Sequence, residues 1–379
     1  MSTATLPSDT PLTSAPRAGA ALRLDRLTKR YDSVTAVHDV SLTIPAGSFV
    51  TLLGPSGSGK TTTLNLIAGF LEPDAGEIMV DDERISGVPP HKRNIGMVFQ
   101  SYALFPHMTV LENVAFPLRM RSTLRGNALR ARVAESLSLV QLAGYEARYP
   151  RQLSGGQQQR VAMARALVSR PRLLLMDESL GALDKRLRER LQVEIKAIHR
   201  TVGTTVVYVT HDQIEALTMS DLIVVMHEGR IVEVGAPRVL YEEPATEFVA
   251  DFLGGANLIP GTLSAIAGAE CVVTLSSGDT LRVPARPDVT RTGSAVRVLI
   301  RPEEMGVLDR APADVGVDSL TGEVLEAVYH GDATRVVVAL AHGPVVAKLA
   351  GRRSGALTTG DPVVIWWPRS SARLIPASA

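Results

Sequence analysis

Gly54-Pro55-Ser56-Gly57-Ser58-Gly59-Lys60-Thr61 decides the fold, together with Phe49-Val50-Thr51-Leu52-Leu53 before it and Thr62-Thr63-Leu64-Asn65-Leu66-Ile67-Ala68-Gly69 after it. The first flank predicts a strand buried on both faces, and the second has helical spacing. Strand, glycine loop and helix form the context in which G-x-x-x-x-G-K-[ST] binds phosphate, because the bent backbone turns its N–H groups toward one anion. We expect Lys60 to hold the β- and γ-phosphates and Thr61 to ligate Mg²⁺. A glycine-rich turn with a chance lysine is the alternative, and the agreement of both flanks disfavours it.

Length and composition limit the possible classes of protein. The 379 residues suggest two to three domains, at roughly 100–200 residues each. A net charge of +1 offers no broad basic surface for nucleic acid, and the single cysteine, Cys271, excludes an internal disulfide framework. No apolar run approaches the roughly 18–20 residues that span a bilayer. Residues 1–20 are predicted to be a disordered tail rather than a signal peptide, and we expect a soluble, cytosolic chain.

The first 100 residues show an α/β pattern before a mostly helical segment begins. Short strands are predicted within 22–49 and over 77–80 and 95–99. Thr109-x-x-Glu112 has the form of a capping box and predicts a helix through Met120. Helical spacing continues over 125–145, so a helical segment interrupts the α/β pattern between Gln100 and about Pro150.

A second glycine-containing helix start lies at Leu153-Ser154-Gly155-Gly156-Gln157. Ser154-x-x-Gln157 is again a capping-box pattern, which predicts a helix through Val168 with both glycines in its first turn. A helix N-terminus with bare glycine backbone attracts anions. An ordinary glycine-rich helix start is the alternative, and the phosphate loop upstream favours the anion site.

Two predicted strands end in side chains that suit phosphate chemistry. The apolar run 173–176 leads into Asp177 and Glu178, and an Asp at the carboxyl edge of a parallel sheet can hold Mg²⁺ through water. Glu178 beside it is placed to polarise an attacking water. The run 205–210 predicts a strand that delivers His211, a donor to a γ-phosphate. A solvated acidic turn and a structural histidine are the alternatives.

The pattern changes after about residue 252. A hairpin is predicted over 223–234 and helix over 237–252. Residues 257–379 contain short β-rich runs broken by Gly and Pro, which is typical of a small β-barrel or sandwich. Gly261-Thr262-Leu263 and Gly322-Glu323-Val324-Leu325 indicate, weakly, two similar halves.

The motifs and their order resemble those of the nucleotide-binding subunits of ATP-binding cassette (ABC) transporters. Over residues 22–250 the matching motifs are the Walker A loop (54–61), the Q-loop glutamine (Gln100), the LSGGQ signature (Ser154–Gln157), the Walker B strand (173–178) and the switch histidine (His211). Residues 257–379 look like the regulatory domain of importers for polyamines, ferric iron, sulfate and related solutes. Arg301-Pro302-Glu303 and Tyr329-His330-Gly331-Asp332 carry that second resemblance.

The resemblance implies a fold and a set of domains. The fold is α/β, a P-loop NTPase whose RecA-like core carries an antiparallel β subdomain and a helical subdomain at about 101–165. The domains are a tail (1–20), an ABC ATPase domain (21–255) and a C-terminal all-β, OB-like (TOBE-like) regulatory barrel (256–379).

The resemblance also implies the residues of the site. Its ATP-binding residues are Tyr31, Gly54, Pro55, Ser56, Gly57, Ser58, Gly59, Lys60, Thr61, Thr62, Gln100, Asp177, Glu178 and His211. Glu178, His211, Gln100 and Lys60 would be catalytic, and Mg²⁺ would be held by Thr61, Gln100 and, through water, Asp177. Tyr31 would stack on the adenine. In a head-to-tail homodimer, Ser154, Gly155, Gly156 and Gln157 would contact the ATP of the other chain.

The implied function is Mg²⁺-dependent ATP hydrolysis that powers import. Partners would be two transmembrane permease subunits and, indirectly, a solute-binding protein, at the cytoplasmic face of the inner membrane and without nucleic acid. Residues 99–110 and 301–303 look most like spermidine/putrescine systems, and ferric iron, sulfate or an aminophosphonate is the alternative. One alternative is a soluble cassette protein that acts on ribosomes or DNA, but such a protein would favour two cassettes in one chain, and this sequence contains one. Another is a small-molecule kinase, which would have no use for the signature at Ser154–Gln157.

Three further features carry specific expectations. Ser179 and Gly181 stand where the family usually has Pro and Ser, which puts communication between the two ATP sites in question. Tyr102 and Phe105 are predicted to line a groove in which a short helix of the permease docks. The alternative is that both rings fill the core of the helical subdomain.

Overall fold

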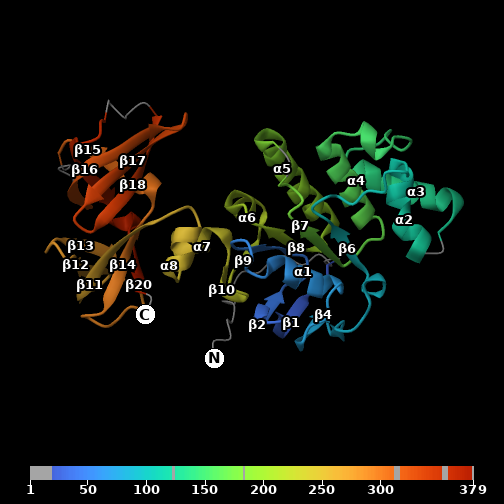
Figure 1. Cartoon of the computed structure of the whole chain (residues 1–379), viewed down its shortest axis with the longest axis horizontal. Coiled ribbons are helices and arrows are strands. Elements are labelled where there is room, and N and C mark those ends of the chain that lie inside the picture. Colours follow the sequence, from blue (N-terminus) through green and yellow to red (C-terminus); the bar gives the residue numbers. More distant parts are fainter. Residues whose placement is uncertain (1–18, 122–123, 182–183, 311–315, 352–356, 378–379) are drawn as a thin grey trace. The chain divides into compact units, whose positions relative to one another are not determined.

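The apolar runs before the phosphate loop and before Glu178 lie in a six-stranded sheet in the computed structural model of the chain (Figure 1). The order is β10-β9-β3-β8-β7-β6, parallel except that β10 is antiparallel to β9. Every residue of β3 and β8 is buried, as expected for central strands covered on both faces. The strands are β3 (Phe49–Leu53), β6 (Ile95–Val98), β7 (Leu173–Asp177), β8 (Thr205–Thr210), β9 (Leu222–His227) and β10 (Arg230–Gly235).

The structure describes residues 19–121, 124–181, 184–310, 316–351 and 357–377, so residues 1–18 of the predicted tail lie outside the described residues. Gly19 and Ala20, the end of that predicted tail, are buried, and Ala20 N donates to Arg172 O at 3.2 Å. The chain divides into two compact units, residues 1–237 and 238–379. No helix among the described residues is long and apolar enough to cross a bilayer.

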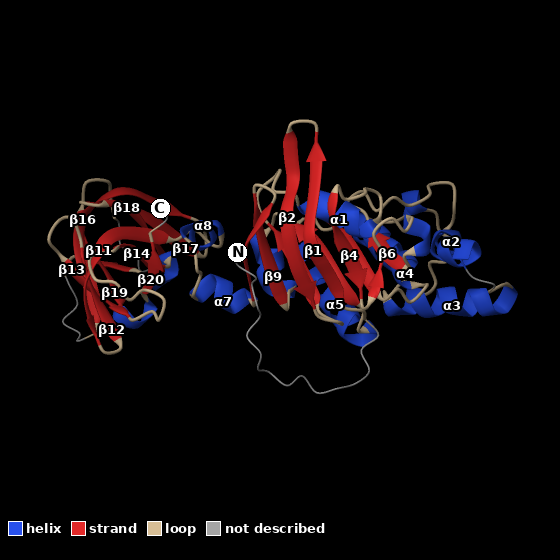
Figure 2. Cartoon of the chain, turned by 90° about the horizontal axis from the view of Figure 1, so that it is seen from below, coloured by secondary structure: helices blue, strands red, loops and turns tan. Residues whose placement is uncertain are grey.

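A second, antiparallel sheet of the first unit has the order β2-β1-β4-β5. Its strands are β1 (Leu22–Tyr31), β2 (Val34–Ile44), β4 (Ala75–Val80) and β5 (Glu83–Arg84). Figure 2 shows β1 and β2 as a long hairpin. One face of this sheet shares a hydrophobic core with the parallel sheet and the helix after the phosphate loop. That packing fixes the hairpin beside the loop.

Helices flank the parallel sheet of the first unit (Figure 1). They are α1 (Lys60–Ala68), α2 (Val110–Arg121), α3 (Gly126–Leu139), α4 (Gly155–Leu167), α5 (Lys185–Val202) and α6 (Gln213–Met219). Helices α2 and α3 pack on α4 beyond the β6 edge of the sheet (Figure 1). Helices α2, α3 and α4 share a core with strands β7 and β8. The predicted capping box at the start of α2 is present, with Thr109 N donating to Glu112 Oε2 at 2.8 Å.

Two helical predictions were wrong in extent. Helix α3 ends at Leu139 rather than near 145, because Gln141 and Gly144 adopt left-handed backbone conformations that break the helix. The stretch 237–252 forms two short helices, α7 (Pro237–Glu242) and α8 (Glu247–Phe252), because Pro244 interrupts the pattern.

The second unit contains two five-stranded antiparallel sheets around one hydrophobic core. The orders are β13-β12-β11-β14-β20 and β15-β19-β16-β17-β18. The strands are β11 (Asn257–Ala267), β12 (Glu270–Thr274), β13 (Thr280–Pro284), β14 (Ala295–Ile300), β15 (Gly306–Leu308), β16 (Val317–Tyr329), β17 (Ala333–Leu340), β18 (Gly343–Ala350), β19 (Pro362–Pro368) and β20 (Arg373–Pro376).

The weak internal repeat corresponds to equivalent places in the two sheets. Gly261 lies in β11 and Gly322 in β16, the central strand of each sheet. A Cβ at either glycine would come within 2.4 Å of a packed neighbour. The strand register shifts shortly after each glycine, between Leu263 and Ala265 and between Val324 and Glu326. Each glycine therefore precedes an irregularity that bends its strand.

The two compact units divide at 237/238, earlier than the 255/256 boundary that the sequence predicts. Arg301 explains the difference, because its guanidinium donates to Ala250 O at 2.9 Å and to Leu253 O at 2.5 Å and also bonds Tyr241 O. Arg301 is 5% exposed, and burial lowers its pKa. The arginine thereby fixes α7 and α8 to the β-sheet unit.

Candidate active site

The phosphate loop joins β3 to α1 and has the backbone that its glycines allow. Gly57 and Gly59 have φ of 80° and 94°, which L side chains rarely adopt. A Cβ on Gly59 would also approach the Ala36 carbonyl oxygen of β2 to 2.4 Å. The loop therefore lies against the β1–β2 hairpin, and glycine is required at position 59 on two grounds.

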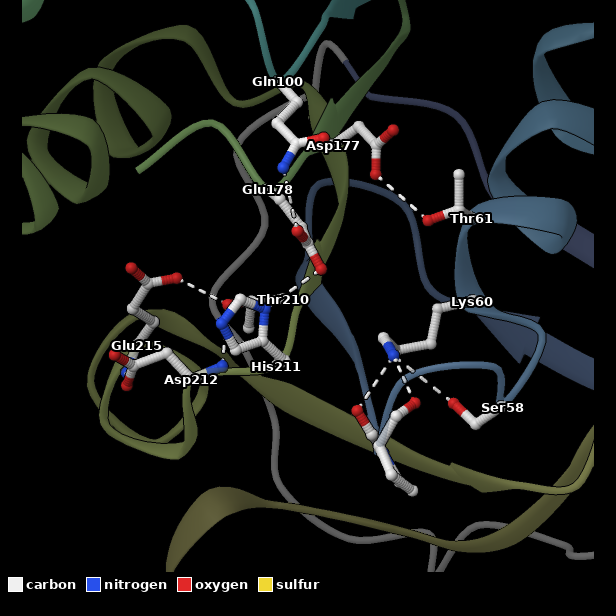
Figure 3. Close-up of polar contacts among 12 residues, drawn as sticks. Ser58, Lys60, Thr61, Gln100, Asp177, Glu178, Thr210, His211, Asp212 and Glu215 are labelled. Carbon is white, nitrogen blue, oxygen red and sulfur yellow. Dashed lines mark hydrogen bonds and ion pairs between the residues drawn. The ribbon is translucent and has the colours of Figure 1, made fainter. Parts of the chain in front are cut away.

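Lys60 points into the loop (Figure 3). Its ammonium donates to the carbonyl oxygens of Gly54 and Pro55, both at 2.8 Å. The residue is 5% exposed, and burial lowers its pKa, against the opposing effect of the Glu178 and Asp177 carboxylates. A buried cation beside the first helical turn is suited to an incoming polyphosphate.

Asp177 ends β7 and faces the start of α1 (Figure 3). Its Oδ1 lies 3.4 Å from the hydroxyl of Thr61, a residue 116 positions earlier in the chain. Burial raises the pKa of Asp177, and the Glu178 carboxylate raises it further. The parallel sheet thus brings together the Asp and Thr that the sequence analysis expects at a metal.

Glu178 connects Gln100 and His211 (Figure 3). Its two carboxylate oxygens lie 3.2 Å from Gln100 Nε2 and 3.1 Å from His211 Nδ1. The backbone of Glu178 is left-handed, with φ of 39°, and its N–H donates to Val209 O at 3.0 Å. A strained non-glycine residue held by a neighbouring strand is typical of a functional position.

The signature residues begin α4 as a capping box. Ser154 N donates to Gln157 Oε1 at 3.0 Å, and the Ser154 hydroxyl accepts from Gln157 N at 3.4 Å. Gly155 and Gly156 occupy the first turn, as predicted. In the described part of the chain, the hydrogen bonds of this motif stay near the start of α4 and Tyr145, away from the phosphate loop.

Tyr31 and Thr62 complete the predicted set. Tyr31 ends β1 at the tip of the hairpin, with its side chain 44% exposed and Lys29 Nζ 5.8 Å from the ring centroid. Thr62 lies in the first turn of α1 and is half-buried. Neither makes a described contact with Glu178 or His211.

The structure separates Tyr102 from Phe105. Tyr102 is 8% exposed and belongs to the core under the helices, so its predicted place in a groove is wrong. Phe105 is half-buried and packs on Phe116, with ring centroids 4.7 Å apart. It lines a groove of about 490 Å³, together with Phe70, Phe99, Phe116, Met120 and Arg165.

The turn after Gln100 is held from two helices. Tyr102 and Ala103 have φ of 60° and 46°, and Arg165 of α4 donates to both of their carbonyl oxygens at 2.7 Å. Asn113 of α2 accepts from Phe105 N at 2.8 Å. A pair of left-handed non-glycine residues persists only where surrounding contacts enforce it, and these two side chains provide them.

Several residues around His211 were missed by the sequence analysis. Helix α6 begins directly after it, with Asp212 Oδ1 accepting from Ile214 N at 2.8 Å. The helix buries Glu215, which accepts hydrogen bonds from Thr210 and Tyr208. Asp212-x-x-Glu215 has the form of a helix start, so this pattern could have located α6.

Position 181 does not itself require glycine. A Cβ on Gly181 would meet Glu178 O at an ordinary 3.7 Å, and no left-handed φ is present there. Ser179 is 1% exposed, and among described residues its hydroxyl has no hydrogen-bond partner. The structure provides no local reason for either departure from the family pattern.

These motifs, on one parallel sheet with an antiparallel β subdomain and a helical subdomain, define an ABC-type ATPase. Residues 37–181 match the family model of the ABC transporter, and residues 298–375 match that of the TOBE domain. The chain is 49% identical to the spermidine/putrescine import ATP-binding protein PotA of Rubrobacter xylanophilus, over 92% of this chain and 91% of that protein. The PotA of Acidothermus cellulolyticus is 48% identical over 95% of each chain. The chain belongs to this family of ABC import ATP-binding proteins.

Solved structures of ABC cassettes agree with the fold of the first unit. A dimeric ATP-binding cassette in a post-hydrolysis state with ADP and Pi is 36% identical, with a TM-score of 0.52 over 57% of this chain and 99% of that one. The cbiO1 subunit of Clostridium perfringens, part of an ABC transporter complex, is 29% identical, with a TM-score of 0.55 over 59% of this chain and 90% of that one. The predicted P-loop NTPase fold with a TOBE-type β unit is confirmed.

Proposed function

We propose that the chain hydrolyses ATP to power import of a polyamine, spermidine or putrescine, through a membrane permease. The observation that carries the proposal is the convergence of Gln100 and His211 on Glu178, beside the Asp177–Thr61 pair and the buried ammonium of Lys60. A small-molecule kinase would have no use for the Ser154–Gln157 signature at the start of α4.

The site residues divide the work of phosphoryl transfer. Lys60 and the loop N–H groups stabilise the charge on the β- and γ-phosphates. Glu178 accepts the proton of a water that attacks the γ-phosphorus, while the bond to the ADP oxygen breaks. Gln100 orients the Glu178 carboxylate that accepts this proton. His211 donates a hydrogen bond to the γ-phosphate. Such catalysis depends mainly on position, which the strand ends provide.

Three residues from α1, the end of β7 and the segment after β6 fit Mg²⁺. Their donors are oxygen atoms of Thr61 and Gln100 and, through water, Asp177, which is the ligand set that this hard cation prefers. Burial and the neighbouring Glu178 raise the pKa of Asp177, and a bound divalent cation would relieve that repulsion. A Mg²⁺ ion held by these residues would supply positive charge to offset the charge of the phosphates.

We further propose that the site is completed in a head-to-tail homodimer. Ser154, Gly155, Gly156 and Gln157 present a helix N-terminus with glycine backbone and an anion-binding geometry without a lysine of their own. They would bind the γ-phosphate of the partner's ATP. Tyr31, at the exposed tip of the hairpin beside the loop, would stack on the adenine.

The remaining partners follow from the importer role. Two permease subunits would receive the motion, a solute-binding protein would act through them, and the chain would lie at the cytoplasmic face of the inner membrane. Residues 256–379 would act as the regulatory domain. Polyamine is favoured because the relatives of 44–50% identity are named for spermidine/putrescine import. Ferric iron, sulfate or an aminophosphonate would need the same ATPase with other permeases.

Reconstitution tests this proposal. The chain is co-purified with the permease subunits encoded beside it and placed in liposomes with their solute-binding protein. Spermidine or putrescine should stimulate ATP hydrolysis, and ferric iron, sulfate and aminophosphonate should not. If only one of those three solutes stimulates ATP hydrolysis, that solute replaces polyamine as the proposed cargo of the importer. If no permease co-purifies and ATPase activity is insensitive to every solute, the importer role must be abandoned.

A further inference from the structure

We propose that Thr210 is a positioning residue for His211, with buried Glu215 as its anchor. The inference rests on the proposed role of His211 at the γ-phosphate. His211 itself cannot define its own position by packing, because its side chain is 61% exposed. The contact described for its ring is with Glu178, another site residue. Its place must therefore come from the backbone on either side.

A chain of hydrogen bonds holds that backbone (Figure 3). The Thr210 hydroxyl donates to Glu215 Oε2 at 2.7 Å and accepts from Asp212 N at 3.0 Å. A hydroxyl has one proton, so donation to the carboxylate leaves its lone pairs for the N–H. The residues before and after His211 are thus tied to each other and to α6.

Glu215 is a buried anchor. It is 2% exposed, as is Thr210, and an unpaired carboxylate at such a depth is costly. Arg188 of α5 lies nearby, with Nε 3.9 Å from Glu215 Oε1 and Nη1 3.1 Å from Asp212 Oδ2. The carboxylate thereby orders the turn that carries His211 between α5, α6 and β8.

Tyr208 provides a matched comparison within the same cluster. Its hydroxyl donates to the same Oε2 of Glu215, at 2.5 Å, and the residue is fully buried. Tyr208 has no described bond to Asp212 N, however, so its loss leaves the tie across His211 in place. Removing either hydroxyl costs a buried hydrogen bond to Glu215. Of the two hydroxyls, however, only that of Thr210 also accepts a hydrogen bond from the backbone beside His211.

The experiment compares Thr210→Val, Thr210→Ser and Tyr208→Phe by steady-state ATPase kinetics and thermal melts. Thr210→Val should lower kcat roughly 10- to 100-fold with KM for ATP within about twofold, as expected when a reacting group is misplaced. Thr210→Ser, which keeps the hydroxyl, should restore kcat to within about threefold of the wild type. Tyr208→Phe should lower Tm with kcat within about twofold.

A double-mutant cycle with His211→Ala separates the inference from the proposed function. If Thr210 acts through His211, Thr210→Val should cause no further loss of turnover in the His211→Ala background. The low turnover of these variants is measured by the release of radiolabelled phosphate. Equal losses in both backgrounds, or a Tyr208→Phe loss as large as that of Thr210→Val, would overturn the inference. Wild-type turnover in His211→Ala alone would instead overturn the role of His211. If Thr210→Val does not fold, Thr210→Ala, which also lacks the hydroxyl that bonds Glu215 and Asp212 N, takes its place in the comparison with Thr210→Ser, with the same expected loss of kcat.

Discussion

At the scale of single residues, Glu178 combines a left-handed backbone with contacts to Gln100 and His211. Glu178→Gln keeps the shape of the side chain and removes its basicity. We expect turnover to fall by ~10²–10⁴-fold, the usual effect of losing a general base, while ATP still binds and an ATP-bound dimer accumulates. Phosphate release and nucleotide affinity, measured on the same preparation, check both parts.

Lys60→Ala is the matched control for that substitution. Because the proposed contact of Lys60 with phosphate is made in the ground state, its loss should weaken ATP binding itself. Near-normal turnover in Glu178→Gln would remove Glu178 from the role of base. A parallel loss of ATP affinity in both variants would mean that Glu178 acts in binding.

The buried Glu215 carboxylate predicts a pH dependence of stability. Burial raises its pKa above the ordinary 4.5, although bonds from Thr210 and Tyr208 oppose the shift. A raised folded-state pKa means that the stabilising contribution is complete below the unfolded-state pKa and is lost as pH rises through the folded-state pKa. The Tm of Glu215→Gln minus that of the wild type should therefore increase as pH rises from about 4 toward neutrality. A difference that is flat or decreases with pH contradicts the burial argument.

The sequence predicted the side chains of the site but not the hydrogen bonds that position them. Lys60, Asp177 and Glu178 lie in local patterns that state their chemistry, whereas the Thr210–Glu215–Asp212 bonds depend on how α6 turns back on β8. Tyr102 shows the same limit. Its aromatic character suited either a groove or a core, and the ring lies in the core of the helical subdomain.

At the scale of elements, the turn between Gln100 and α2 connects the site to the groove lined by Phe105. An apolar groove with a polar rim is typical of a partner site, and a permease helix is the proposed occupant. Phe105→Ala should leave ATPase activity and the Tm of the isolated chain nearly unchanged while weakening permease assembly, since a central aromatic truncation can cost about 2 kcal/mol of binding. Co-purification yield and a thermal melt provide the measurements.

Tyr102→Ala serves as the core control. Because Tyr102 is 8% exposed, its truncation leaves a cavity and should lower Tm by several degrees. If Phe105→Ala lowers Tm as much as Tyr102→Ala does, Phe105 is also a core residue and the docking proposal fails.

The elements themselves were predictable where local patterns are strong. Capping boxes at Thr109 and Ser154 located the starts of α2 and α4, and the buried runs located β3, β7 and β8. Helix ends were less predictable. Helix α3 ends at Leu139 because Gln141 has a left-handed backbone. Glutamine is not a residue that usually ends helices, so the sequence contains no clear stop signal at this position.

At the scale of the whole molecule, the signature and the phosphate loop make separate sets of bonds within one chain. The dimer proposal therefore predicts complementation. Chains with Ser154→Arg and chains with Lys60→Ala, each inactive alone, should form mixed dimers with one intact composite site and regain part of the activity. Dissociation, mixing and ATPase assay provide the measurement.

Mixing the same variant with itself is the control for that complementation. Recovery only in the mixed sample would support a site shared between two chains. If mixing restores nothing although mixed dimers form, hydrolysis is completed within one chain and the shared site must be discarded.

The bonds of Lys60 to its own loop also bear on which anions the protein selects. An anion that draws this ammonium out of its loop competes with two 2.8 Å bonds, to Gly54 O and Pro55 O. Inorganic phosphate offers few other contacts to offset that exchange. ATP brings a whole triphosphate and a base, so its other contacts can offset the bonds that Lys60 gives up.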